Sequence, residues 1–181
     1  NELELESCNN IIYLPDCPKL NKLTLRDCIN IIELPDFPEL VELDINNSFK
    51  IISLPIYEKL NKLKLWKYNI KDLPYFPYLK YLEIMECPKI ISIPNYEELI
   101  ELKLSNSNII NIPKLSKLKK LQSFRNSNII QYYESLEILE LYSLDIINLP
   151  YFRNLKVLVI YGCNNIETIP SYKTLLALHI R

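Results

Sequence analysis

The chain has 181 residues, enough for one domain of ordinary size, and 49% of them are hydrophobic, which is ample for a core. Its 21 basic and 22 acidic residues give a net charge of -1 and are spread evenly, which argues against a surface for nucleic acid or an anionic membrane. A single glycine excludes the glycine-rich nucleotide loops, and no apolar run approaches the roughly eighteen residues of a membrane helix.

A short motif, L-x-x-L-x-L, recurs along the chain and predicts one β-strand in each copy. The alternation in Leu23-Thr24-Leu25 points one face of the strand inward and the other outward. Further strands are expected from Leu3 at the beginning to Ile180 at the end. The blocks predict one array over 1–181 with about nine to ten repeats, and they start at Leu20, Leu40, Leu60, Leu79, Leu99, Leu118, Leu136, Leu155 and Leu175.

The segments between the strands are predicted to be extended or 3-10 backbone and not α-helix. Six residues before each block start stands Leu or Ile, and proline follows it in every copy except at Gln131. Such prolines hold φ near extended values and forbid a regular helix. A second column lies three residues before each block start, and its aromatic part from Phe37 to Tyr172 is predicted to stack in the core: Cys17, Phe37, Tyr57, Phe76, Tyr96, Leu115, Tyr133, Phe152 and Tyr172.

With the template L-x-x-L-x-L-x-x-C/S-x-x-I-x-x-L-P-x-x-P-x, the sequence resembles the leucine-rich repeat family over essentially its whole length. The 20-residue LPxxP form is similar to repeats of bacterial secreted effectors, and also to plant intracellular immune receptors and giant-virus arrays. The resemblance implies a mainly β, right-handed solenoid with one parallel concave sheet, a convex side of extended or 3-10 segments and little or no α-helix. Such repeats are stable only as a column, because each turn shares its apolar face with two neighbours.

The repeat over 118–135 departs from the template. Strict spacing turns Ser123 inward and Phe124 outward, whereas the match of FRNSNII to LSNSNII in the preceding turn turns Phe124 inward. A β-bulge at Gln122 and Ser123 reconciles the two and is favoured, because an unpaired serine in a leucine column costs stability. The 18-residue length and Gln131 predict a kink or hinge in this turn.

The cysteines are interpreted as structural. Cys8, Cys28, Cys87 and Cys163 fall two residues past a strand, where the family carries an inward Asn or Cys, and a thiol there caps backbone carbonyls. The cysteine number is odd, and only Cys8 and Cys28 come within bridging range of each other, which favours a reducing compartment. The cytoplasm is therefore expected, with secretion into a host cytosol as an alternative.

No chemistry-bearing constellation emerges from the sequence. There is no C-x-x-C pair, and the one histidine, His179, is interpreted as a surface residue. We therefore predict no catalytic residues, no cofactor and no metal.

The outward strand positions divide into a charged half and an apolar half. Charges alternate in the columns Glu2, Lys22, Glu42, Lys62 and Asp44, Lys64, Glu83, Lys103, which predicts cross-strand ion pairs. Exposed aromatic and thioether side chains on a rigid concave face are typical of interface hot spots. The partner-binding residues are predicted to be Trp66, Met85, Tyr142, Tyr161, Tyr81, Val159 and Phe124, with Ile138 and Val157 widening the stripe.

The sequence thus predicts a non-enzymatic module that binds a partner protein on its concave face, without nucleic acid or membrane. One alternative, implied by the effector resemblance, is the substrate-recognition arm of a larger effector or ubiquitin-ligase protein whose catalytic domain lies outside these residues. Another is an assembly protein that associates end to end through uncapped solenoid ends, since strands are expected at both ends of the array.

Overall fold

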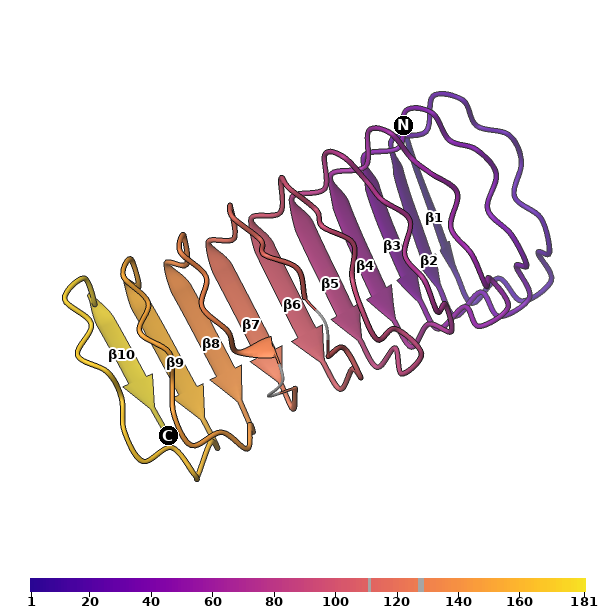
Figure 1. Cartoon of the computed structure of the whole chain (residues 1–181). Coiled ribbons are helices and arrows are strands. Elements are labelled where there is room, and N and C mark those ends of the chain that lie inside the picture. Colours follow the sequence, from indigo (N-terminus) through magenta and orange to yellow (C-terminus); the bar gives the residue numbers. More distant parts are fainter. Residues whose placement is uncertain (111, 127–128) are drawn as a thin grey trace.

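The computed structural model describes residues 1–110, 112–126 and 129–181, and these form a parallel β-solenoid (Figure 1). A single sheet of ten strands runs through it, and each strand pairs only with its predecessor and successor along the chain. The strands are β1 Glu2–Glu6, β2 Lys22–Arg26, β3 Glu42–Asn46, β4 Lys62–Trp66, β5 Tyr81–Met85, β6 Glu101–Ser105, β7 Lys120–Phe124, β8 Ile138–Tyr142, β9 Val157–Tyr161 and β10 Ala177–Ile180.

Hydrophobic alternation explains where the strands lie and which way they face. From β3 to β9, the second and fourth residues of every strand are buried, and the first and third are half-buried on the opposite face. The register aligns equivalent residues, as in Leu63 opposite Leu82 and Leu82 opposite Leu102. The predicted mainly β architecture is confirmed, and no α-helix occurs in the described residues.

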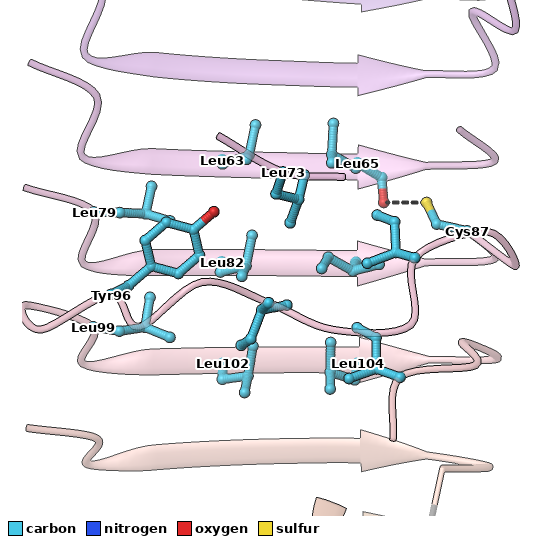
Figure 2. Packing of buried hydrophobic residues seen from close by; sticks show 14 of the residues in the cluster. Leu63, Leu65, Leu73, Leu79, Leu82, Cys87, Tyr96, Leu99, Leu102 and Leu104 are labelled. Carbon is cyan, nitrogen blue, oxygen red and sulfur yellow. Dashed lines mark hydrogen bonds between the residues drawn. The ribbon is translucent and has the colours of Figure 1, made fainter. Parts of the chain in front are cut away.

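The return segments close each turn over the leucines (Figure 2). A hydrogen bond joins each block-start leucine to the core residue three positions earlier, as from Leu79 N to Phe76 O at 3.2 Å. Leu73, Leu79 and Leu82 are all buried, so one turn contributes inward side chains from both its strand and its return segment. Apolar burial shared between neighbouring turns is what stabilises such a column.

The predicted aromatic column is confirmed as buried core: the second-column residues from Phe37 to Tyr172, here called the core spine, are all buried, and three pairs of neighbouring rings in it stack. Phe76 and Tyr96 are stacked at 6.3 Å between ring centroids, and Phe37 and Tyr57 at the same distance. Each tyrosine hydroxyl needs a partner because it is buried. Tyr96 donates to the carbonyl of Pro74 at 2.8 Å, so the proline column supplies acceptors as well as fixing the backbone.

A left-handed residue follows nearly every strand and turns the chain into its return segment. Gly162 has φ +64°, but the eight other such residues are not glycine, for example Asn47 at +56° and Lys67 at +51°. The backbone N–H of Asn47 donates to the carbonyl of Trp66 at 2.9 Å, which extends the ladder beyond the strand end. None of the nine is β-branched, in keeping with the steric cost of this conformation for branched side chains.

The predicted capping by thiols is confirmed two residues past the strands. Cys87 Sγ donates to the carbonyls of Met85 at 3.3 Å and Leu65 at 3.6 Å, and Figure 2 marks the second bond. Cys28 makes the equivalent pair of contacts with Arg26 and Leu5. Burial raises the pKa of Cys87 to about 11, so this thiol stays protonated and unreactive at neutral pH. All five cysteines are free.

The β-bulge expected at Gln122 and Ser123 was wrong. Strand β7 pairs in regular register on both sides, with Ser123 opposite Leu104 and opposite Leu141. Ser123 is buried in the leucine column and Phe124 lies half-buried on the outward face. The serine is tolerated because its hydroxyl donates to the carbonyl of Asn126 at 2.6 Å, so it is not an unpaired polar group.

The irregular repeat is held by two amides that the sequence reading did not assign. Asn126 occupies the capping position and donates to Ser107 Oγ at 2.9 Å and to the carbonyls of Ser107 and Ile109. Gln131, which replaces a proline, donates to the carbonyl of Ile112 at 3.1 Å. The sheet therefore crosses this repeat without losing register, and the hinge stays a prediction. Positions 127 and 128 of the repeat lie outside the described residues.

Removal of the hydroxyl from each of two buried tyrosines should change the free energy of unfolding in opposite directions. Tyr96→Phe removes the hydrogen bond to Pro74 and should lower the free energy of unfolding by about 1 kcal/mol. The hydroxyl of Tyr68 is buried without a partner among the described residues, so Tyr68→Phe should raise it by about 1 kcal/mol. Urea unfolding followed by the fluorescence of the single tryptophan measures both. Equal destabilisation by the two variants would show that Tyr68 has a partner, such as an internal water.

Candidate functional site

The outward face of the sheet carries the candidate site, built from the first, third and fifth residues of each strand. Because the strands are parallel and in register, these residues form three straight columns across the sheet. We call the fifth-position residues from β4 to β9 the outer column: Trp66, Met85, Ser105, Phe124, Tyr142 and Tyr161.

Ion pairs occupy the face in the N-terminal half. Lys22 lies 3.1 Å from Glu2 and Lys62 lies 3.5 Å from Glu42, which confirms two of the pairs predicted in the first column. Arg26 also pairs with Glu4. These groups are exposed enough for solvent to screen them, so each pair contributes little to stability. Their consequence is that this half of the face already satisfies its own charges.

The second predicted column is only partly an ion-pair ladder. Lys64 contacts Glu83 at 3.9 Å, but Lys103 turns to Glu101 at 3.5 Å on its own strand. Burial raises the pKa of Asp44, and the nearby positive charge of Lys64 opposes that effect. The third position of β3 is therefore a desolvated carboxyl and not an exposed member of a ladder.

Tyr81 does not join the predicted apolar stripe. Its hydroxyl donates to Glu83, and the ammonium groups of Lys62 and Lys103 lie 5.6 and 5.3 Å from its ring centroid. Burial and the neighbouring carboxylate raise the pKa of this phenol. The ring is enclosed by lysine side chains, so Tyr81 organises the charged centre of the face instead of offering a free apolar surface.

Three aromatic residues of the outer column form a stack on the C-terminal half. Phe124 and Tyr142 have ring centroids 6.4 Å apart, and Tyr142 and Tyr161 are stacked at 5.7 Å. The Tyr142 hydroxyl donates to Glu140 at 3.2 Å, which restrains the ring. Ring pairs at this spacing attract each other beyond their burial, so the stack presents a rigid ridge.

The other predicted residues form two groups, one beside the ridge and one beyond its Phe124 end. Ile138, Val157 and Val159 are half-buried outward residues of β8 and β9 and extend the apolar surface beside Tyr142 and Tyr161. Trp66 and Met85 are register partners on β4 and β5, beyond the Phe124 end of the ridge. Trp66 is 41% exposed, and Lys67 Nζ lies 5.7 Å from its ring centroid. The structure thus brings Phe124, Tyr142, Tyr161 and Val159 together and keeps Trp66 and Met85 apart from them.

A hollow separates these two groups. It has a volume of about 560 Å³, with Met85 at one side, Phe124 and Tyr142 at the other, and Ser105 at the floor. Glu83 and Lys103 line its polar side. A smaller hollow of about 260 Å³ follows on the far side of Met85 and reaches Trp66. The face is therefore a ridge with adjoining depressions, which suits a contoured protein surface.

The described part of the chain shows no cluster of potential metal ligands. No group of three or more His, Cys, Asp or Glu side chains gathers there in a way that would hold a metal ion. His179 is exposed on β10. Over the same residues, the structure contains no helix with the length and apolar character that a membrane crossing needs.

Comparison with known proteins provides no identification. No protein-family model and no curated protein sequence matches this chain. What the structure establishes is a parallel β-solenoid of about 20-residue repeats.

Ser105 is the site residue whose importance sequence reasoning missed. The pattern placed it in the outward column but offered no reason to single it out. The available signal was its size, because it is the one small side chain between Trp66 and Tyr161 in a column of large residues. A small side chain leaves a hollow between its large neighbours only when the flanking strands are in register. The strand pairing shows that they are.

Proposed function

We propose that the chain is a leucine-rich-repeat array that binds a partner protein on the outward face of its sheet, without catalysing a reaction. The observation that carries the proposal is the outer column, in which large aromatic and thioether side chains remain accessible although the solenoid needs none of them for its core. Aromatic anchors beside a depression are what protein interfaces use as hot spots.

The arrangement of charges supports the same proposal. Ion pairs link the first and third columns of the face from Glu2 as far as Glu140, whereas the outer column carries no charge from Trp66 to Tyr161. Interfaces are depleted of charge at their centre and polar at their rim. We therefore place the centre of the interface between Trp66 and Tyr161.

The test measures partner affinity after removal of two anchors. Immobilised protein captures partners from a lysate of the source cells, mass spectrometry identifies them, and the purified partner is titrated against variants. The double variant Trp66→Ala, Tyr142→Ala should weaken binding by about 100-fold or more, because hot-spot truncations often cost 2 kcal/mol or more each. Its melting temperature should stay within about 3 °C of wild type, since outward side chains contribute little to the core.

A matched control removes two exposed aromatics outside the strands. Tyr13 and Tyr132 are 62% and 53% exposed and lie on return segments. Tyr13→Ala, Tyr132→Ala should leave the affinity unchanged. If this control weakens binding as much as the double variant of the outer column, or if the latter binds like wild type, the outward face is not the interface.

A further inference from the structure

The large side chains of the outer column are interrupted at Ser105, and the gap there is as wide as one aromatic ring. Adjacent strands in a sheet are about 4.8 Å apart, so Met85 and Phe124, which flank Ser105, are two such steps from each other. The resident rings pack at centroid distances of 6.4 and 5.7 Å on adjacent strands. One further ring placed over Ser105 would therefore contact both neighbours and continue the stack.

The walls and floor of this slot differ in chemistry. Met85 contributes a polarisable thioether and Phe124 a ring face, both suited to an aromatic guest. Ser105 lies at the floor with 9% of its surface exposed, and its hydroxyl can both donate and accept a hydrogen bond. A ring that carries a hydroxyl at its far end matches an apolar slot with a polar floor.

The lysines around the slot are paired with carboxylates. The outward residues of β4 to β8, together with the residue after each strand, include six basic and four acidic side chains, and every basic one except Arg125 forms an ion pair with a carboxylate of the described residues. The basic residues are Lys62, Lys64, Lys67, Lys103, Lys120 and Arg125, and the acidic ones are Glu83, Glu86, Glu101 and Glu140.

Arg125 is the basic group best placed to act on a guest. Its guanidinium lies 5.2 Å from the centroid of the Phe124 ring, which forms one wall of the slot. No carboxylate among the described residues forms an ion pair with it. The positive charge of Arg125 therefore favours a guest that carries acidic residues beside its aromatic residue.

We infer that the slot over Ser105 receives a tyrosine side chain presented by an acidic segment of the partner protein. The ring fills the missing step between Met85 and Phe124, its hydroxyl bonds the Ser105 hydroxyl, and the flanking carboxylates face Arg125. This inference rests on the proposed function and names the chemistry that the outward face recognises.

Short peptides test it without knowledge of the partner. The probe is acetyl-Asp-Glu-Tyr-Glu-Asp-amide, titrated against the 15N-labelled chain by NMR. The amide signals of β5 to β7 should shift on binding, and those of β1 and β2 should not. Replacement of the peptide tyrosine by alanine, or of its four acids by lysine and arginine, should weaken binding by about tenfold or more. Equal binding by all three peptides would overturn the inference.

Substitutions at the floor separate the slot from general attraction to the face. Ser105→Trp should fill the slot and abolish binding of the tyrosine peptide, and the matched control Asn46→Trp, in the same outward register on β3, should not. Ser105→Ala should weaken the tyrosine peptide about fivefold, as expected for one hydrogen bond. It should leave a phenylalanine peptide unchanged. If Ser105→Trp still binds the tyrosine peptide at wild-type affinity, the slot is not the receptor.

The outcomes distinguish this inference from the proposed function. Failure of the peptides at the slot, together with partner capture that depends on Trp66 and Tyr142, would overturn the tyrosine assignment and leave the interface in place. Peptide binding that Ser105→Trp abolishes supports the assignment. Loss of both the peptide effect and the dependence of capture on the outer column would overturn the two together.

Discussion

Phe76→Ala should lower the free energy of unfolding by about 3–5 kcal/mol, the range for removal of a fully buried phenylalanine. Phe76 has no exposed surface and its ring stacks on Tyr96 of the next turn. The cavity would lie between two turns that depend on each other for their buried surface. In a solenoid each turn contacts only its neighbours, so the array cannot redistribute the loss over a common core.

Urea unfolding by fluorescence and hydrogen exchange measures this effect. Amide protection should fall most for β4 to β6, on either side of the cavity, and less toward β1 and β9. Tyr78→Ala is the matched control, because Tyr78 lies in the same turn but is 61% exposed. It should change the free energy of unfolding by less than about 0.5 kcal/mol. Similar losses for the two variants would show that the core spine does not carry the stability of the array.

Asn126→Ala should lower the free energy of unfolding by about 2–3 kcal/mol, because one buried amide satisfies several acceptors. Its side chain donates to Ser107 Oγ at 2.9 Å and to the carbonyls of Ser107 and Ile109 at 3.2 and 3.3 Å. Alanine would leave these acceptors buried and unpaired, each at a cost of about 1 kcal/mol or more. The loss falls on the repeat that already carries Ser123 in its leucine column.

Asn108→Ala provides the comparison, since Asn108 is an exposed asparagine of the preceding turn with one hydrogen bond, to the carbonyl of Pro88 at 2.9 Å. Water replaces that bond when the side chain is removed, so the expected loss is about 0.5 kcal/mol. Thermal unfolding of the two variants, followed by circular dichroism, separates them. Equal stability of Asn126→Ala and wild type would mean that the backbone of this repeat does not depend on the amide.

The sequence was informative about the site wherever register alone decides a position. Alternation of two residues fixes which side chains face outward, so Trp66, Met85, Tyr142 and Tyr161 could be assigned to one column before any coordinates. Tyr81 belongs to the same face but is enclosed by Lys62 and Lys103. Which neighbours a side chain engages depends on rotamers and distances across strands, and these do not appear in the pattern.

The irregular repeat shows a feature that the sequence pattern predicted wrongly. The similarity of FRNSNII to the preceding turn suggested an inward Phe124 and a bulge, because a serine in the core looked unpaired. In the fold, the carbonyl of Asn126 is close enough to accept from Ser123, and regular pairing is retained. The sequence shows that Ser123 and Asn126 are three residues apart, but only the path of the backbone brings the hydroxyl and the carbonyl within hydrogen-bond distance.

The repeat by itself determined the solenoid, the parallel sheet and the buried columns of this protein, because turns of similar length with the same apolar positions bury those positions by stacking on their neighbours. Tertiary structure alone decided the hollow over Ser105, the position of Arg125 against Phe124 and the amide network of Asn126. Those features arise where one turn differs from the next. Their physical effect is set by atoms of neighbouring turns, about 20 residues away in the chain and a single strand spacing away in space.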